Sequence, residues 1–163
     1  MSVVSNTTPI NYLVQIGHAE TLRALFGRVF VPSVVVAELS DAGAPEVVRT
    51  WITNPPEWIS VEEVIVPHDD ALGALEPGER AAIVLAEQRS LLLVIDELEG
   101  RRVAKVRGLL VTGTLGVLDR AAARGLLDFT DAIARLQRTT FHVSSKLLKP
   151  LLERDRTRKS RGT

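Results

Sequence analysis

The segment LLLVIDELEG, residues 91–100, decides the fold class of this chain. Its first five residues are all aliphatic, and such a run predicts a strand that a parallel sheet buries on both faces. Two acidic residues follow soon after, and the pattern beyond them predicts a helix that continues through Arg107. A buried strand followed by a helix is typical of the βαβ units from which parallel sheets are built.

The same alternation of strands and helices extends from this segment toward both ends of the chain. Further strands are predicted at residues 3–4, 29–31, 58–66 and 109–111. Helices are predicted at residues 8–17, 18–26, 33–41, 45–53, 77–90, 115–125, 130–139 and 144–154. Because helices separate most of the strands, we predict an α/β fold with a central parallel sheet and helices on both faces.

Length and composition limit the class of protein. A chain of 163 residues suits one domain with a substantial core. The absence of cysteine excludes disulfides, thiolate metal sites and cysteine nucleophiles, and it is compatible with a reducing cytosol. The longest apolar runs, 81–86 and 91–95, are too short to span a membrane, and no signal peptide is recognisable. We therefore expect a cytoplasmic protein that does not insert into membranes.

The distribution of charge is more informative than its sum. Lys+Arg and Asp+Glu both number 20, so the net charge gives no indication of nucleic-acid binding. Basic residues nevertheless gather between Arg154 and Arg161, and again at Arg101, Arg102, Lys105 and Arg107. The first group is either a frayed, solvated end or a contact for a phosphate backbone. We accordingly divide the chain into a domain at residues 1–150 and a basic tail at 151–163.

Polar side chains follow nearly every predicted strand, where α/β sheets bind their ligands. Several of them are carboxylates, which repel one another in a shared pocket unless a cation neutralises them. Oxygen ligands without cysteine, and without histidine at ligand spacing, favour Mg²⁺ or Mn²⁺ over Zn²⁺, and Mg²⁺ in turn favours phosphate chemistry. The residues are Asn6, Thr7, Thr8, Glu38, Glu79, Asp96, Glu97, Thr112 and Thr114.

Three of these acidic residues have a plain structural interpretation as well. Glu79 lies in the first turn of a predicted helix, where a carboxylate gains roughly 0.3–1 kcal/mol from the helix dipole. Glu38 lies among apolar residues and could point to solvent from an edge. Asp96 could cap the helix that follows it.

The remaining polar residues also have two interpretations. Glu97 and Glu99 could be ordinary charges on a helix surface. Thr112 and Thr114 could satisfy backbone groups within a turn. Each residue is a weak signal by itself, and the position that they share at the strand ends is the stronger one.

Five segments resemble, in order and spacing, a prokaryotic branch of the PIN-domain (PilT N-terminus) family. The resemblance covers residues 3–150 and implies a three-layer α/β/α fold with a central parallel sheet. It also implies a Mg²⁺- or Mn²⁺-dependent ribonuclease, often the toxin of a type II toxin–antitoxin pair. Such a toxin would have RNA as its substrate, a small antitoxin protein as its partner, and a homodimer as its expected assembly. The segments are VVSNTTPINYLVQIG, FGRVFVPSVVVAELS, LEPGERAAIVLAEQ, LLLVIDELEGRRVAKVRGL and VTGTLGVLDRAAARGLL.

The resemblance also implies roles for individual residues. The acidic, metal-binding pocket of the family falls on Asn6, Glu38, Glu79 and Asp96, with Glu97 adjacent and able to assist. Thr7 and Thr8 match the hydroxyl residues that orient groups around the metal, and Thr112 and Thr114 are expected to support the pocket similarly. Gly100, Arg101, Arg102 and Lys105 would lie beside it, where the three cations could hold an RNA backbone.

Asn6 departs from the family pattern, in which the first position is normally aspartate. Asparagine keeps the shape and one neutral carbonyl oxygen but loses the charge, so metal binding should weaken and activity could fall steeply. Two interpretations remain open. Asn6 is either native, giving a weak nuclease or a non-catalytic module that binds RNA or a partner, or a substitution made to inactivate a toxic enzyme.

Two other classes of protein with parallel sheets fit less well. A phosphate-loop NTPase is disfavoured because no G-x-x-x-x-G-K-[ST] motif occurs. A signalling receiver would need a phosphoacceptor aspartate, then a hydroxyl residue and a lysine at later strand ends. Asp96 and Thr112 could supply the first two, but no lysine ends a later strand.

Overall fold

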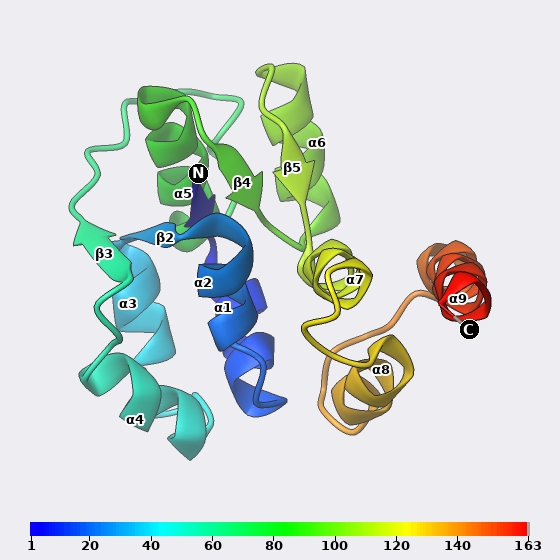
Figure 1. Ribbon diagram of the computed structural model, residues 1–163. Coiled ribbons are helices and arrows are strands. Elements are labelled where there is room, and N and C mark those ends of the chain that lie inside the picture. Colours follow the sequence, from blue (N-terminus) through cyan, green and yellow to red (C-terminus); the bar gives the residue numbers. More distant parts are fainter. Residues whose placement is uncertain (163) are drawn as a thin grey trace.

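The computed structural model describes residues 1–162, whose strands form one parallel sheet in the order β3-β2-β1-β4-β5 (Figure 1). The chain begins with β1 in the middle of the sheet and adds β2 and then β3 on one side of it. It then crosses over and adds β4 and β5 on the other side. The strand order therefore reverses between β1 and β4, and α/β sheets bind their ligands at such a topological switch point. The strands are β1 (Ser2–Ser5), β2 (Arg28–Pro32), β3 (Ile59–Glu62), β4 (Leu92–Val94) and β5 (Val111–Thr112).

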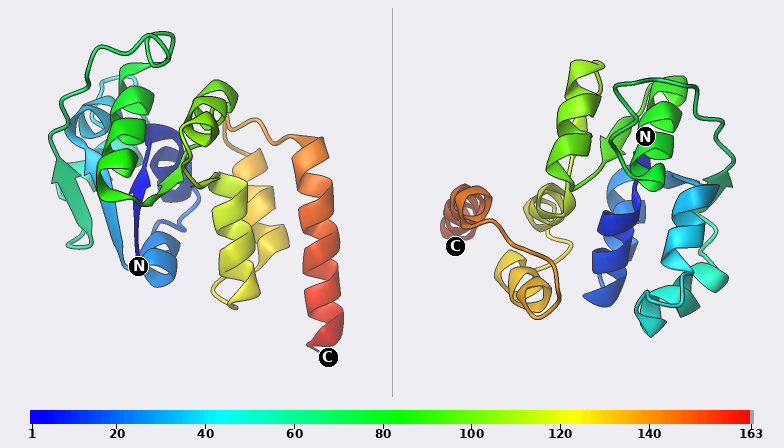
Figure 2. Two further views of the ribbon diagram at one scale, coloured as in Figure 1. Left: turned by 90° about the horizontal axis from the view of Figure 1, so that it is seen from above. Right: turned by 180° about the vertical axis from the view of Figure 1, so that it is seen from behind.

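Helices cover both faces of the sheet and complete three layers (Figures 1 and 2). Val3 and Val4 are neighbours in β1, yet they belong to two different buried clusters, because successive side chains of a strand point to opposite faces. Helices α5 and α6 supply the cluster around Val4, and the other helices supply the cluster around Val3. The α/β prediction is confirmed.

The helices agree closely with those predicted from the sequence. Each predicted helical range overlaps a helix of the structure, and most boundaries differ by one to three residues. No helix within residues 1–162 is both long enough and apolar enough to cross a membrane. The helices are α1 (Thr7–Gln15), α2 (Glu20–Phe26), α3 (Ser33–Leu39), α4 (Glu46–Thr53), α5 (Pro77–Arg89), α6 (Leu98–Val106), α7 (Thr114–Ala123), α8 (Phe129–Gln137) and α9 (Ser145–Arg161).

The edge strands are the least accurately predicted elements. The strand expected at 109–111 is instead β5, Val111–Thr112. Leu109 is still tied to the end of α6, because its N–H donates to the carbonyl of Ala104, and the Leu110 side chain is exposed. At the other edge, β3 covers only Ile59–Glu62 of the expected range 58–66. Pairing, rather than β-branched composition, decides where these strands end.

The basic C-terminus is a helix that packs on the domain. Helix α9 continues without a break through residue 150, where the sequence analysis divided the chain, and it lies beside α7 and α8 (Figure 2). Arg154 and Arg158 both pair with Asp119 of α7, at 2.7 and 2.9 Å. The interpretation of a frayed, solvated end is therefore wrong for the residues up to Arg161. Thr163, the last residue of the predicted tail, lies outside the described residues.

Candidate functional site

The polar residues singled out in the sequence gather at the carboxyl ends of β1 and β4. Asn6 directly follows β1 and begins α1, and only 2% of its surface is exposed. Its backbone N–H donates to the carbonyl of Val94 at 3.0 Å, which ties the turn after β1 to the end of β4. Asp96 and Glu97 follow β4 at the same edge. The candidate site therefore lies at the topological switch point between β1 and β4, where the strand order reverses.

The side chain of Asn6 is paired on one side and free on the other. Its Nδ2 donates to Glu97 Oε2 at 3.1 Å, and the hydroxyl of Thr8 donates to the other Glu97 oxygen. Asn6 Oδ1 is buried and has no hydrogen-bond partner within the described residues. An unsatisfied buried acceptor costs about 1–3 kcal/mol, so this atom has a free-energy reason to bind a cation or another donor.

Glu97 and Glu99 differ although they are two residues apart. Glu97 begins α6 but turns its carboxylate toward α1, where Asn6 and Thr8 bind it, so the interpretation of a helix-surface charge is wrong for this residue. Glu99 is exposed and pairs with Arg102 one turn along the helix, as a surface charge should. The sequence pattern could not distinguish these two glutamates. Glu97 is the residue before the first turn of α6, and its extended backbone gives its side chain a direction that the helical periodicity does not predict.

Glu38 links α1, α3 and α5. One carboxylate oxygen accepts a hydrogen bond from the hydroxyl of Thr7, and the other accepts from the backbone N–H of Gly78 at 3.1 Å. A side chain at position 78 would collide with this carboxylate, because a Cβ there would lie 2.6 Å from Glu38 Oε2. Glu38 is half-buried, so the interpretation of a residue pointing to solvent is wrong.

Glu79 combines a structural role with a place in the acidic cluster. Its Oε2 accepts from the backbone N–H of Glu76 at 3.1 Å, which forms a capping box and confirms that Glu79 lies in the first turn of a helix, α5. Its Oε1 faces α6, where a Cβ on Gly100 would lie only 2.8 Å away. Burial raises the pKa of Glu79, the Glu76 N–H opposes this, and the charges of Glu97, Glu76 and Glu38 raise the pKa further.

Asp96 caps a helix, but not the one that follows it. Its two oxygens accept from the backbone N–H of Thr114 at 2.7 Å and from the Thr114 hydroxyl at 2.6 Å, so it holds the start of α7. Burial raises the pKa of Asp96; the hydrogen bonds from Thr114 oppose the rise. The negative charge of Glu97 raises the pKa as well, and Arg101 lowers it.

The other predicted supporting residues lie at different distances from this cluster. Arg101 is half-buried and donates to the carbonyl of Ile95 at 2.9 Å. Arg102 and Lys105 are exposed on α6, and neither contacts a carboxylate of the cluster. Thr112 packs against Gly116 of α7 and has no hydrogen bond to the acidic residues, so only Thr114 of the two threonines reaches them.

The donor set of the cluster has the chemistry that a hard divalent cation prefers. All its ligand atoms are oxygens, neighbouring carboxylates help to raise the pKa of Glu79 and of Asp96, and within residues 1–162 Asn6 offers a buried acceptor without a partner. The carboxylates are nevertheless bound to hydroxyls and backbone N–H groups. Within residues 1–162, no three His, Cys, Asp or Glu side chains are grouped so that they could hold a metal ion together. The cluster therefore has donor atoms of the right type for a divalent cation, but these atoms are not arranged as a preformed metal site.

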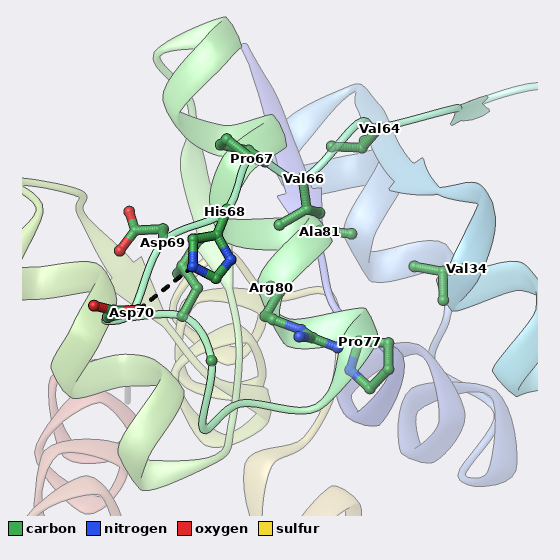
Figure 3. Close-up of a pocket in the computed structure, with 12 residues that line it drawn as sticks. Val34, Val64, Val66, Pro67, His68, Asp69, Asp70, Pro77, Arg80 and Ala81 are labelled. Atoms are coloured by element: carbon green, nitrogen blue, oxygen red, sulfur yellow. Dashed lines mark ion pairs between the residues drawn. The ribbon is translucent and has the colours of Figure 1, made fainter.

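Two hollows lie near the cluster. The larger, about 620 Å³, is bounded by residues 64–73 and the start of α5, and Arg80 projects into it (Figure 3). None of the predicted site residues lines it. The smaller, about 420 Å³, begins at Thr7 and Glu38 and continues past Asn11 and Gln15. These two amides were not predicted as site residues, although their spacing of four and eight residues from Thr7 places all three on one face of α1.

Comparison with known proteins agrees with this architecture. A family model described as a PIN domain matches residues 2–156, from β1 into α9. No curated protein and no solved structure gives a significant match to the chain. The PIN domain is a nuclease-type fold whose members generally use divalent metal ions. Because the match covers nearly the whole chain and agrees with the sheet and the helices described above, the protein belongs to the PIN-domain family.

Proposed function

We propose that this protein is a Mg²⁺- or Mn²⁺-dependent endoribonuclease that hydrolyses RNA phosphodiesters. The observation that carries the proposal is that Glu38, Glu79 and Glu97 come together beside the buried Oδ1 of Asn6, which has no partner within residues 1–162, and that the charges of Glu97 and Glu38 raise the pKa of Glu79. Carboxylates that come together in a partly buried site favour a bound cation. Because the PIN domain is a nuclease-type fold, we infer that this cation would assist the hydrolysis of a phosphodiester.

Each residue of the cluster has a role in this proposal. Asn6, Glu38, Glu79 and Asp96 would hold the metal, with Glu97 assisting. When bound, the ion would polarise a phosphoryl oxygen and lower the pKa of a water molecule. Thr7, Thr8 and Thr114 hold the carboxylates in place through their hydroxyls, and Thr112 would support the turn before α7. Arg101, Arg102 and Lys105 would contact the RNA backbone.

Asn6 makes a second function worth testing, namely a non-catalytic PIN-fold module that binds RNA or a protein partner. A neutral amide lowers the negative charge of the site by one, so the ion should bind less tightly than to an aspartate. The parent chain should therefore bind Mn²⁺ weakly and cleave RNA slowly.

The experiment changes Asn6→Asp and compares Mn²⁺ binding by calorimetry and Mn²⁺-dependent cleavage of single-stranded RNA with the parent. We expect the variant to bind Mn²⁺ at least ten-fold more tightly and to cleave RNA faster. If neither protein binds Mn²⁺ nor cleaves RNA, while both remain folded, the nuclease proposal fails and the non-catalytic module is favoured.

The partners follow from the same proposal. We propose that the protein is the cytoplasmic toxin of a type II toxin–antitoxin pair, bound by a small antitoxin protein, and that it forms a homodimer. Leu98 and Val106 on α6 are 84% and 78% exposed, which offers an apolar helix surface for such contacts. A neighbouring gene for a small DNA-binding protein, and co-purification of its product with this chain, would support the pair. Sedimentation as a monomer would contradict the homodimer.

A further inference from the structure

The groove along α1 is continuous with the acidic cluster. Thr7 and Glu38 line one end of it, and these two side chains are joined by a hydrogen bond within the candidate site. From there the groove follows α1 past Asn11 and Gln15. Its volume of about 420 Å³ lies within the range of small-molecule sites. A strand of RNA whose phosphate lay at the cluster would therefore have a place for an adjoining nucleotide.

The groove is lined by groups that recognise neutral polar edges rather than phosphates. Among the described residues that line it, Glu38 is the only charged one, and none is a lysine or arginine. Gln15 Nε2 donates to Asn11 Oδ1 at 3.0 Å, which fixes the two amides against each other. This hydrogen bond uses Gln15 Nε2 and Asn11 Oδ1, so it leaves Asn11 Nδ2 as a donor and Gln15 Oε1 as an acceptor for a ligand. Such a donor and acceptor side by side match the edge of a nucleobase.

The opposite wall of the groove leaves room for a ring. Gly43, Ala44 and Pro45, between α3 and α4, carry small side chains or none, and none of them offers a side-chain donor or acceptor. The amides on α1 are therefore the groups that could discriminate between bases. Thr140 also lines the groove, and its hydroxyl is already hydrogen-bonded to that of Tyr12 at 2.7 Å.

We propose that this groove binds the nucleotide next to the scissile phosphodiester of single-stranded RNA, and that Asn11 and Gln15 read its base. The inference rests on the proposed function, because it takes RNA as the ligand of the adjoining cluster. It adds a specificity site that neither the acidic residues nor the basic face of α6 provides.

The test measures base preference by binding and by cleavage. Binding of hexamers of A, C, G and U to the parent chain is followed by fluorescence anisotropy in buffer without metal. The parent should prefer one base by about five-fold or more, as expected for an amide contact with a base edge. Asn11→Ala and Gln15→Ala should reduce that preference to within about two-fold. Gln88→Ala, an exposed glutamine on α5, should leave it unchanged.

Cleavage separates failure of this inference from failure of the proposed function. The Asn6→Asp variant is incubated with RNA of randomised sequence and Mn²⁺, alone and combined with each alanine change, and the new ends are sequenced. Loss of base preference at a single position beside the cut supports the groove. Cleavage with an unaltered preference in both alanine variants overturns the groove but leaves the nuclease intact. Absence of cleavage and of RNA binding in all forms overturns both.

Discussion

At the scale of single residues, the acidic cluster shows what local pattern can and cannot predict. Asp96 and Glu79 were identifiable because each lies at a boundary between elements, where chemistry-bearing residues of α/β folds occur. Their hydrogen bonds to Thr114 and Glu76 explain why both are tolerated in a partly buried position. The direction of Glu97 toward Asn6 was not predictable, because it depends on how α6 is placed against α1.

The contact between Thr114 and Asp96 should contribute measurably to stability. Thr114→Val keeps the shape of the side chain but removes one of the two hydrogen bonds to a carboxylate in a desolvated position. We expect unfolding free energy to fall by about 1.5–3 kcal/mol, the usual range for a hydrogen bond to a charged group. Urea unfolding measures the change. The matched control is Thr112→Val, whose hydroxyl bonds none of the acidic residues, and an equal loss in the control would contradict the assignment.

His18 should make stability depend on pH below neutrality. Burial, assisted by the charge of Arg135 and opposed by Asp131, lowers the pKa of His18 from its ordinary value of 6.5. The Nε2 atom of His18 is buried and has no hydrogen-bond partner in the described part of the chain. The His18 imidazole therefore binds a proton more readily in the unfolded chain than in the folded one. This difference does not affect the free energy of unfolding above pH 6.5, and it destabilises the fold as the pH falls below 6.5.

The measurement compares urea unfolding at pH 7.5 and pH 5.5 for the parent and His18→Gln. Between pH 7.5 and pH 5.5, we expect the change in the free energy of unfolding to be less unfavourable for the variant than for the parent. The comparison cancels the opposite contributions of Glu79 and Asp96, whose raised pKa values favour the folded state at lower pH, because both proteins contain them. An identical pH dependence in the two proteins would refute a role for His18.

At the scale of elements, the strands and helices that a local sequence pattern specifies were predicted correctly. Strand bounds and contacts that depend on a neighbouring element were not. The strand β4 was predictable because a short aliphatic run between predicted helices is typical of a strand that a parallel sheet buries on both faces. The bounds of β5 were not, since only pairing with β4 determines which residues of 109–112 join the sheet. Ion pairs between α7 and α9 join residues more than thirty positions apart, so no local pattern reports them.

The attachment of α9 to α7 should depend on Asp119. This aspartate is 7% exposed and accepts hydrogen bonds from Arg154 and Arg158, at 2.7 and 2.9 Å. Asp119→Asn removes the charge that both arginines contact, and we expect a loss of about 1–3 kcal/mol in urea unfolding. Asp131→Asn is the matched control, because its pair with Arg135 is exposed and should contribute less than about 1 kcal/mol. Similar losses in both variants would contradict a special role for Asp119.

At the scale of the whole molecule, the fold joins a nuclease-type sheet to a group of helices beyond β5. Helices α7, α8 and α9 lie together at that end (Figure 2), and Leu148, Leu151 and Leu152 of α9 pack against the larger apolar cluster. The family match likewise extends to residue 156, beyond the boundary drawn from the basic composition. Composition alone suggested a tail because it does not show which basic residues have acidic partners in space.

If residues 151–163 were an independent tail, a chain ending at residue 150 would be as stable as the parent. We expect instead a loss of more than about 2 kcal/mol, because the two ion pairs of Asp119 with Arg154 and Arg158 would be lost and the core would lose Leu151 and Leu152. Thermal and urea unfolding measure the difference. The control is Arg156→Ala, which removes an exposed basic residue without an ion pair among residues 1–162, and it should leave stability within about 0.5 kcal/mol of the parent. Equal stability of the shortened and full chains would restore the tail as a separate segment.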